Sequence, residues 1–498
     1  IIGPLTRLRS PRWINMANGL YDAIVVGSGP NGLAAAIALA CNGHRVLVRE
    51  AAATIGGGTR SKELTLPGYL HDVCSAVHPM ALASPFFRTL PLAEHGLEWV
   101  QPPLPFAHPL DDDSVFQARS VEETADQLGV DAGDYRRLMQ PMVDHADDIM
   151  RELVGPLSIP HHMITAARFG WRGLRSGRGL AEHYFRTAKA QALIAGLAAH
   201  GQLPLEWKPG GAVALMLGLA GHAVGWPLPR GGSEKIASAL ASIFQNAGGE
   251  IETGRPVATL ADLPPARAIL LDVTPRQVVA IAGDHLPNGY RRKLEKYRYG
   301  MGVWKVDWAL AGPIPWRSDA CRRAGTIHVG GTLAEIADAE RQTWAGDHPD
   351  RPFVMLAQPT IFDPSRAPPG KHIAWGYCHV PHASQVDMTD RIERQIERFA
   401  PGFRDLILAK HTMSTIAMEA YNANYIGGDI NGGVQDLWQL FSRPVLKINP
   451  YATPVPGLFI CSSSTPPGGG VHGLCGYFAA RSAERFLRDH TPAGPVAM

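Results

Sequence analysis

Residues 21–50 read YDAIVVGSGPNGLAAAIALACNGHRVLVRE, and this stretch decides the fold. It starts with the apolar run DAIVV, continues through a glycine-rich turn and then becomes rich in alanine and leucine, which predicts a strand, a turn and a helix. The alternating segment HRVLVRE that follows predicts a second strand. Strand, turn, helix and strand in this order are the β-α-β unit with which α/β proteins bind dinucleotides.

The turn carries the pattern G-x-G-x-x-G. The first glycine permits the tight bend, the second lets the backbone approach a pyrophosphate, and the third lets the helix pack closely on the strand. Free N–H groups at the helix start favour the phosphates. Glu50, at the end of the second strand, is placed to accept hydrogen bonds from an adenosine ribose, and its charge disfavours the 2′-phosphate of NADP. The predicted phosphate-binding residues are Gly27, Ser28, Gly29, Pro30, Asn31 and Gly32.

The continuation EAAATIGGGTRS (50–61) distinguishes between NAD and FAD. It places Gly56 and Gly57 shortly after Glu50, with Ser61 beyond them. This arrangement resembles the second FAD signature of the flavin amine oxidase and phytoene desaturase superfamily, in which the glycines pass close to the ribityl and flavin end. A nicotinamide dehydrogenase has no need of this signature, so the resemblance implies FAD as the cofactor.

Four further stretches carry the same likeness: ELTLPGYLHDVCSAVHPMALASPFF, PLPRGGSEKIASAL, YGMGVWKVDWALAGPIPW and STPPGGGVHGLCGYFAARSA. From Tyr21 to Leu487 the chain resembles a phytoene dehydrogenase-related FAD oxidoreductase of the pyridine nucleotide-disulfide oxidoreductase domain-containing protein 2 type. The sequence has no C-x-x-C pair, so no disulfide chemistry is inferred.

The resemblance implies an α/β protein with a GR2-type FAD-binding Rossmann-like domain and an interleaved α+β substrate domain. Two later segments fit this fold. The first predicts a helix, with Ile236, Leu240 and Phe244 on one face, and then the strand ARAILLDVTP. The second, PGLFICSSSTPPGGGVHGLCGYFAARSAERFL, predicts a strand, a glycine turn and a helix. We expect the FAD-binding domain in residues 21–85, 226–290 and 441–490, and the substrate domain in residues 86–225 and 291–440.

Length and composition agree with two globular domains. The chain has 498 residues, too many for one hydrophobic core, and 45% of them are hydrophobic. With 47 basic and 45 acidic residues, its overall charge gives no attraction to nucleic acid. Six scattered cysteines favour reduced thiols, and no metal site is predicted.

Two segments bear on location. Residues 1–20 are expected to be an unstructured leader, with Met16 as an alternative start and a basic organelle-targeting remnant as another. The apolar stretch Ala212–Trp226 is too short to span a bilayer and predicts a buried helix, with a surface-embedded helix as the rival. The expected location is cytoplasmic, with peripheral membrane contact left open, or an organelle matrix if the leader targets one.

The family resemblance also implies cofactor contacts far along the chain. Val257 matches the residue that touches the adenine through its backbone. Many relatives have an acidic residue where this chain has Ser462, so a hydroxyl or water contact would replace it there. A helix start covering the isoalloxazine would stabilise the negative charge of a reduced flavin. The residues that match this covering turn are Gly468, Gly469, Gly470, Val471 and His472.

Lys305 and His472 are the predicted catalytic residues. Lys305 resembles the strand lysine that flavin amine oxidases place near flavin N5, where it assists reoxidation by oxygen. Because Val303, Lys305 and Asp307 alternate along one face of the predicted strand, a surface lysine on an exposed face is the alternative. His472 would donate to the flavin or act as an acid or base, and the alternative is that it only fixes the glycine turn.

Together these features predict an FAD-dependent oxidoreductase that takes hydride plus proton from an apolar substrate, with an isoprenoid as the suggested class. Electrons would then pass to oxygen or a quinone-like acceptor. The substrate class follows only from fold-level analogy. The alternatives are a flavin amine oxidase, a carotenoid-type isomerase and a non-enzymatic flavin-binding regulatory or interaction protein.

Overall fold

The computed structural model describes residues 20–153, 155 and 163–490, and the predicted β-α-β unit begins its first sheet. β1 (Tyr21–Val26), α1 (Pro30–Ala40) and β2 (Val46–Arg49) follow one another as predicted. The sheet has the order β16-β10-β1-β2-β9, and every pairing in it is parallel. Its other strands are β9 (Glu250–Glu252), β10 (Ala266–Leu271) and β16 (Leu458–Ile460). Three separated segments therefore build one sheet.

Helices cover both faces of this sheet, because its strands are apolar on both sides. Ala23 and Val25 of β1 pack with α1, α10 (Glu234–Asn246) and α18 (Leu474–Asp489) on one face. Ile24 and Val26 pack on the other face with α11 (Pro275–Ala282) and α12 (Asn288–Glu295). The predicted α/β class with a Rossmann-like domain is confirmed.

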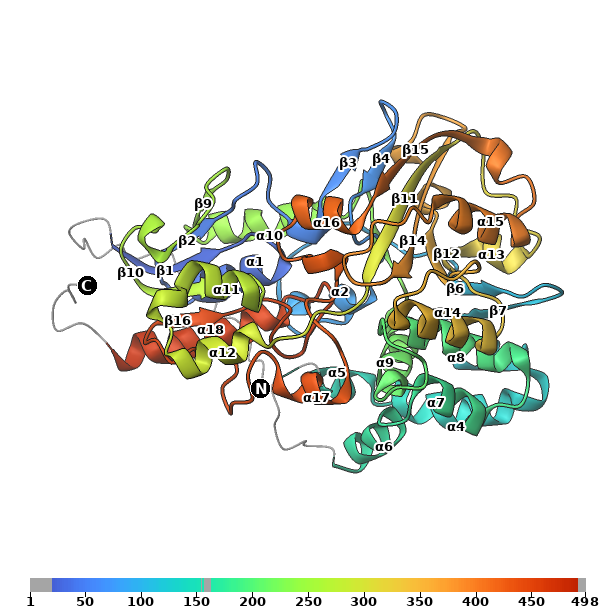
Figure 1. Ribbon diagram of the computed structural model, residues 1–498, viewed down its shortest axis with the longest axis horizontal. Helices are drawn as coiled ribbons and strands as arrows, with labels where there is room; N and C mark the ends of the chain where they lie inside the picture. The colour runs from blue at the N-terminus through green and yellow to red at the C-terminus, as the bar shows by residue number, and fades with distance from the viewer. Residues whose placement is uncertain (1–19, 154, 156–162, 491–498) are drawn as a thin grey trace.

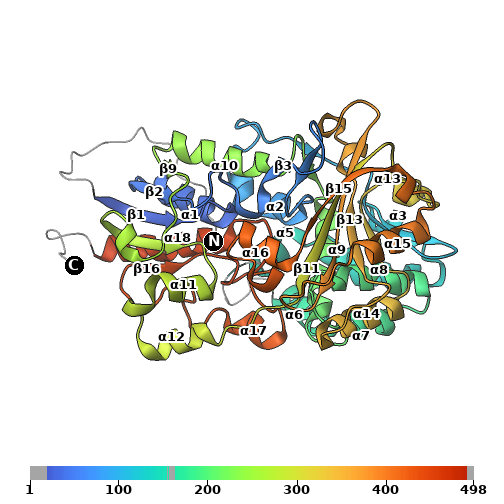
Figure 2. The ribbon, with the colours of Figure 1, turned by 45° about the horizontal axis from the view of Figure 1, so that its top comes forward.

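A second, mixed sheet forms the other half of the molecule, in the order β15-β11-β14-β13-β12-β6-β7. Figures 1 and 2 show the two sheets at opposite ends of the long axis, with α2 (Pro79–Ala83) and α16 (Thr415–Tyr421) between them. Its strands are β6 (Leu104–Pro109), β7 (Ser114–Gln117), β11 (Gly302–Leu310), β12 (Ala324–Val329), β13 (Val354–Ala357), β14 (His372–Val380) and β15 (Ile407–Met413).

Helices also cover both faces of the second sheet. One group packs with Phe106 and Met355. This group contains α4 (Ala132–Val143), α7 (Gly177–Tyr184), α8 (Ala188–Ala199), α9 (Gly210–Ala223) and α14 (Leu333–Ala345). On the opposite face, Trp308 and Leu310 pack with α15 (Thr389–Phe399). Shorter elements used below are β4 (Leu70–Asp72), α6 (Met163–Gly173) and α17 (Leu437–Ser442).

Of the two segments that bear on location, the structure tests the prediction for one. The apolar stretch from Ala212 lies in α9, which is largely buried, so the buried-helix prediction is correct and the surface-embedded alternative is wrong. The predicted leader, residues 1–20, lies outside the described residues except for Leu20. Across the described ranges, no helix is both long enough and apolar enough to cross a bilayer.

Candidate functional site

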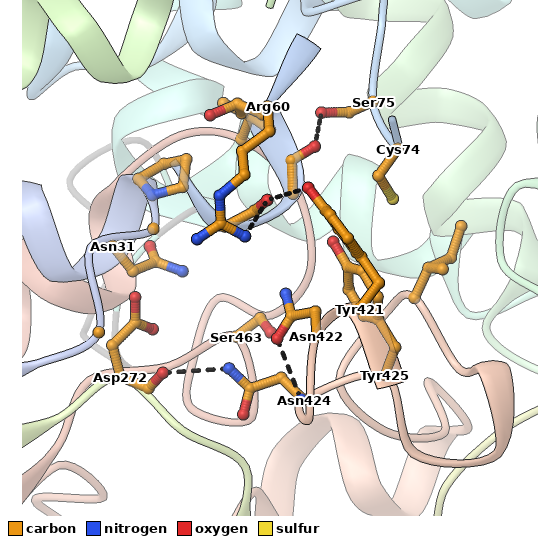
Figure 3. Close-up of a pocket in the computed structure, with 18 of the residues that line it drawn as sticks. Asn31, Arg60, Cys74, Ser75, Asp272, Tyr421, Asn422, Asn424, Tyr425 and Ser463 are labelled. Atoms are coloured by element: carbon orange, nitrogen blue, oxygen red, sulfur yellow. Dashed lines mark hydrogen bonds between the residues drawn. The ribbon is translucent and has the colours of Figure 1, made fainter. Parts of the chain in front are cut away.

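A single cavity of about 770 Å³ connects the first sheet to the second. At one end it is lined by the turn between β1 and α1 and by residues that follow β2 and β10. At the other end it is lined by the face of the second sheet. In Figure 3, Asn31 and Asp272 are seen at one side of this pocket, and Cys74 and Tyr425 at the other. The predicted cofactor residues that line it are Gly27, Ser28, Gly29, Pro30, Asn31, Glu50, Gly57, Val257, Gly470 and Val471.

The two glycine motifs, which the sequence separates, lie against each other at the start of α1. Gly56 N donates a hydrogen bond to Ser28 O at 3.0 Å, and a Cβ on Gly57 would lie 3.1 Å from Gly29 Cα. Gly29 precedes Pro30 at the first position of α1, and no side chain caps the helix. The positive end of the helix dipole therefore lies beside a cradle made of backbone, which suits a pyrophosphate.

Glu50 is buried and its carboxylate already holds the loop together. Oε2 accepts hydrogen bonds from Ser28 N at 2.9 Å and from Ser28 Oγ at 2.5 Å. Oε1 accepts from Ala52 N at 2.8 Å and from Arg60 Nη2 at 3.1 Å. Glu50 thus positions the phosphate turn. Glu50 and Val257 both line the cavity. The predicted contact of Glu50 with the ribose stays a prediction.

Asp272 is a cavity residue that the sequence interpretation missed. It directly follows β10, and because β10 lies beside β1, its Oδ2 reaches α1 and accepts a hydrogen bond from Gly32 N at 2.9 Å. Burial raises the pKa of Asp272 to about 7; the Gly32 N–H opposes this and the charge of Glu50 adds to it. An acidic residue at the carboxyl end of a parallel strand was the available signal, because ligands bind at that edge.

Several predicted site residues are not among the described residues that line the cavity. Ser463 lines it in place of the predicted Ser462, and Ser61 Oγ donates to Asp72 Oδ1 at 2.8 Å. His472 is buried, and its Nδ1 accepts a hydrogen bond from Leu474 N at 3.1 Å. These contacts are those of a residue that fixes the start of α18, and a catalytic role for His472 stays a prediction. The other predicted residues outside the lining are Gly32, Gly56, Gly468, Gly469 and Lys305.

Lys305 is not on the surface, so the alternative of an exposed lysine is wrong. Its side chain is 2% exposed, and Nζ lies 2.5 Å from the Asp307 carboxylate. His71 Nδ1 and His411 Nδ1 each lie 3.6 Å from the same carboxylate. Nζ also lies 5.6 Å from the centroid of the Trp375 ring, which lines the cavity. Lys305 pairs with Tyr377 and Asp307 with Trp375, so this buried charge cluster lies on the cavity-facing side of the sheet, beside the lining residues. The predicted role of Lys305 near the flavin stays a prediction.

The end of the cavity at the second sheet is mainly apolar and aromatic. Its walls include Met80, Leu217, Trp226, Met355, Ala357, Trp375 and Tyr377. The titratable groups there are the imidazoles of His78 and His200 and the side chains of Cys74, Tyr377 and Tyr425. Burial lowers the pKa of His78 to about 4 and that of His200 to about 3, so both imidazoles are neutral. Walls of this kind suit an apolar ligand with few polar groups.

Comparisons with known proteins agree with this geometry. The model of the NAD(P)-binding Rossmann-like domain matches residues 25–89, which fits a dinucleotide cofactor. The chain is 25% identical to mouse (Mus musculus) pyridine nucleotide-disulfide oxidoreductase domain-containing protein 2, across 94% of each chain. It is 26% identical to phytoene dehydrogenase of Streptomyces griseus, across 80% of this chain and 79% of that protein.

Among solved structures, a triple mutant of putrescine oxidase matches with a TM-score of 0.60 at 18% identity, covering 94% of this chain and 99% of that one. At this identity the structural match shows the fold alone. The homologues and structural relatives are oxidoreductases. The chain is thus similar along most of its length to pyridine nucleotide-disulfide oxidoreductase domain-containing protein 2 and to phytoene dehydrogenase, which confirms the resemblance predicted from the sequence.

Proposed function

We propose that this chain is an FAD-dependent oxidoreductase that takes hydride plus proton from an apolar substrate and passes the electrons to oxygen or a quinone-like acceptor. One observation carries the proposal: a single cavity joins the phosphate-binding turn of the first sheet to an apolar aromatic wall on the second. A dinucleotide that starts at the turn would extend toward this wall. The names of the homologues support the redox class.

The residues present fit FAD. The N–H groups at the start of α1 would bind the pyrophosphate, and Glu50 and Val257 would hold the adenosine end. Gly57, which lies against Gly29, would lie between the pyrophosphate and the ribityl chain, and Gly470 and Val471 would lie at the ring end. When bound, FAD would supply the acceptor for the hydride. The chain's own contribution is to orient the substrate and exclude water, so no obligatory base is assigned.

Two measurements test the function. The purified protein should show flavin absorbance bands or acquire them on addition of FAD; a folded protein that does neither would contradict the proposal. Anaerobic addition of an apolar isoprenoid substrate should then bleach the flavin bands. Peroxide release with amines would favour an amine oxidase instead, and a broad screen in which nothing reduces the flavin would favour a non-enzymatic flavin-binding protein.

Asp272 should make FAD affinity depend on pH, because its carboxyl group lies where the anionic pyrophosphate would bind. With a pKa of about 7, this group is neutral at pH 6 and negative at pH 8. If binding requires the protonated form, linkage predicts that Kd rises about tenfold from pH 6 to pH 8. Fluorescence titration with FAD measures this change. The titratable groups that act on Asp272 are Glu50, Cys461 and Cys475.

The matched variant is Asp272→Asn, which keeps the size of the side chain and removes its charge. Its Kd for FAD should be nearly independent of pH and should be lower than that of the wild type at pH 8. An equal pH dependence in both proteins would contradict the assignment of this titration to Asp272.

We also propose that a face formed by α6 and α17 contacts an anionic lipid surface, which would be the source of the apolar substrate. On α6, Trp171 is 74% exposed and Met163 is also exposed, as is Leu174, which directly follows the helix. Arg168, Arg172 and Arg175 lie among them, and none forms an ion pair with a carboxylate of the described residues. Exposed apolar side chains flanked by arginines without a carboxylate partner are typical of helices that bind anionic membranes.

α17 continues this face. Trp438 is 74% exposed and Phe441 is also exposed. Leu437 N donates to Lys208 O just before α9, and a Cβ on Gly173 of α6 would contact Ala212 of α9. Figure 1 shows α6 and α17 along the same lower edge of the molecule. An exposed apolar patch on two neighbouring segments favours an interaction surface.

Vesicle sedimentation tests this surface. The protein should pellet with vesicles that contain phosphatidylglycerol and much less with pure phosphatidylcholine, and added salt should release it. Changing Trp171 and Trp438 together to Ala should abolish pelleting, whereas Leu408→Ser, an exposed site on β15, should not. Loss of self-association, without any vesicle binding, would identify the face as a subunit interface and contradict the lipid proposal.

A further inference from the structure

On the face of the second sheet, the cavity wall contains two polar side-chain atoms that have no hydrogen-bond partner among the described residues, in addition to His78 Nδ1 elsewhere in the wall. The two atoms on the sheet are Thr326 Oγ1 and Trp375 Nε1. Thr326 is 2% exposed and Trp375 is 5% exposed, and both residues line the cavity. Polar atoms this deeply buried are normally paired, so two unpaired ones in the wall of the same cavity require an explanation.

The strand register brings these two side chains to the same place. Thr326 of β12 pairs with Ala357 of β13, and Ala357 pairs with Trp375 of β14. Residues directly opposite each other in neighbouring antiparallel strands point to the same face of the sheet. Met355 and Tyr377 pair in the adjacent row, and all five residues line the cavity. The small Ala357 therefore separates two larger side chains that carry unpaired polar atoms.

The chemistry of the two atoms specifies what they can bind. The indole N–H of Trp375 can only donate a hydrogen bond, and the hydroxyl of Thr326 can donate one. Leaving a buried donor unpaired costs about 1–3 kcal/mol, which a ligand with an acceptor oxygen would recover. A pure hydrocarbon would leave both donors unpaired.

The charges around this wall argue against an ammonium group on the ligand. Of the cavity-lining residues, the only carboxylates are Glu50 and Asp272, and both lie at the dinucleotide end. Lys305, near the Trp375 ring on the same face of the sheet, is paired with Asp307 and provides no free charge of either sign. The imidazole of His200 is neutral, and its Nε2 lies 3.0 Å from His328 Nε2. An amine cation would thus be buried without a counter-ion, which is costly.

We infer that the substrate is an apolar molecule with one uncharged acceptor oxygen of the carbonyl type, held by Trp375 Nε1 and Thr326 Oγ1. This inference rests on the proposed function, because it assigns the substrate class of the same cavity. The hydrogen bonds fix the polar end on the sheet, and the apolar remainder lies among Met80, Leu217 and Trp226.

Three probes with the same carbon skeleton test the inference by isothermal titration calorimetry: 4-phenyl-2-butanone, 4-phenyl-2-butylamine and butylbenzene. The wild-type protein should bind the ketone at least about tenfold more tightly than the other two, as expected for two hydrogen bonds. Thr326→Val and Trp375→Phe should each weaken ketone binding about 3- to 10-fold and leave butylbenzene binding unchanged.

Trp304→Phe is the matched control, because Trp304 Nε1 donates to Thr389 Oγ1 at 3.1 Å and Trp304 does not line the cavity. This variant should keep the wild-type preference for the ketone. Equal binding of ketone and hydrocarbon, or tightest binding of the amine, would overturn the inference.

FAD uptake, measured in the same preparations, separates this inference from the proposed function. Ketone preference without any FAD uptake would support the oxygen site and contradict the oxidoreductase. FAD uptake without ketone preference would overturn the oxygen site alone.

Discussion

Lys305→Met should lower the free energy of unfolding by about 3–5 kcal/mol, the usual cost of removing one partner of a buried ion pair. Asp307 is fully buried, and without the ammonium group its remaining neighbours are His71 and His411, each at 3.6 Å. Burial alone would raise the pKa of Asp307, but Lys305 and the two histidines outweigh it and hold the pKa below its usual value. Urea denaturation of both proteins measures the loss.

The loss of unfolding free energy in Lys305→Met should depend on pH. In the wild type, the lowered pKa of Asp307 contributes stability that is present at neutral pH and disappears as the pH falls through its folded value. In Lys305→Met, the same carboxyl group should have a raised pKa, so its stability contribution is lost as pH rises. The difference between the two proteins should therefore be largest at neutral pH and should shrink as the pH falls below the usual pKa of an aspartate toward the lower folded value of Asp307.

A double variant is the control. Lys305→Met combined with Asp307→Leu removes both charges and should recover most of the lost stability, because an apolar pair avoids the desolvation cost. If Lys305→Met alone is as stable as the wild type, the ion pair of Lys305 and Asp307 is solvated and the prediction is wrong. If Lys305 instead acts on the flavin, the double variant should be stable yet show slower reoxidation by oxygen at an unchanged rate of flavin reduction.

The parts of the fold that depend on neighbouring residues could be predicted from the sequence. The unit from β1 to β2 spans residues 21–49, and its apolar runs, glycine turn and helix stop follow one another directly. The strand β10 and the helices α10 and α18 were predictable for the same reason. Local pattern and local structure agree there, so no knowledge of the distant chain was needed.

The site residues that were missed depend on contacts between distant segments. Asp272 reaches α1 only because β10 pairs with β1, which lies more than two hundred residues earlier. The alternation around Lys305 showed which residues share a face but not that β4 would cover that face with His71. Thr326 and Trp375 become neighbours only through the register of three strands. No periodicity within one strand contains that information.

Gly32→Ala should weaken FAD binding at least about 100-fold, which equals about 2.7 kcal/mol. A Cβ on Gly32 would lie 2.1 Å from Gly27 O, and this neighbour is backbone, so it cannot rotate away as a side chain could. The turn must open, which moves the N–H groups at the start of α1 away from the pyrophosphate. Fluorescence titration with FAD measures the loss, and near-ultraviolet circular dichroism reports whether the fold is kept.

Two further variants make this result specific to the turn. In Gly29→Ala the nearest neighbour of the new Cβ is the side-chain atom Asp272 Oδ2 at 3.1 Å, which can move by a few tenths of an ångström, so the loss should be smaller. Gly289→Ala, in α12, meets nothing within 4 Å and should leave FAD binding unchanged. An unchanged Kd in a folded Gly32→Ala protein would mean that the dinucleotide does not use this turn. A loss graded in the order Gly32, Gly29 and Gly289 would locate the pyrophosphate at the start of α1.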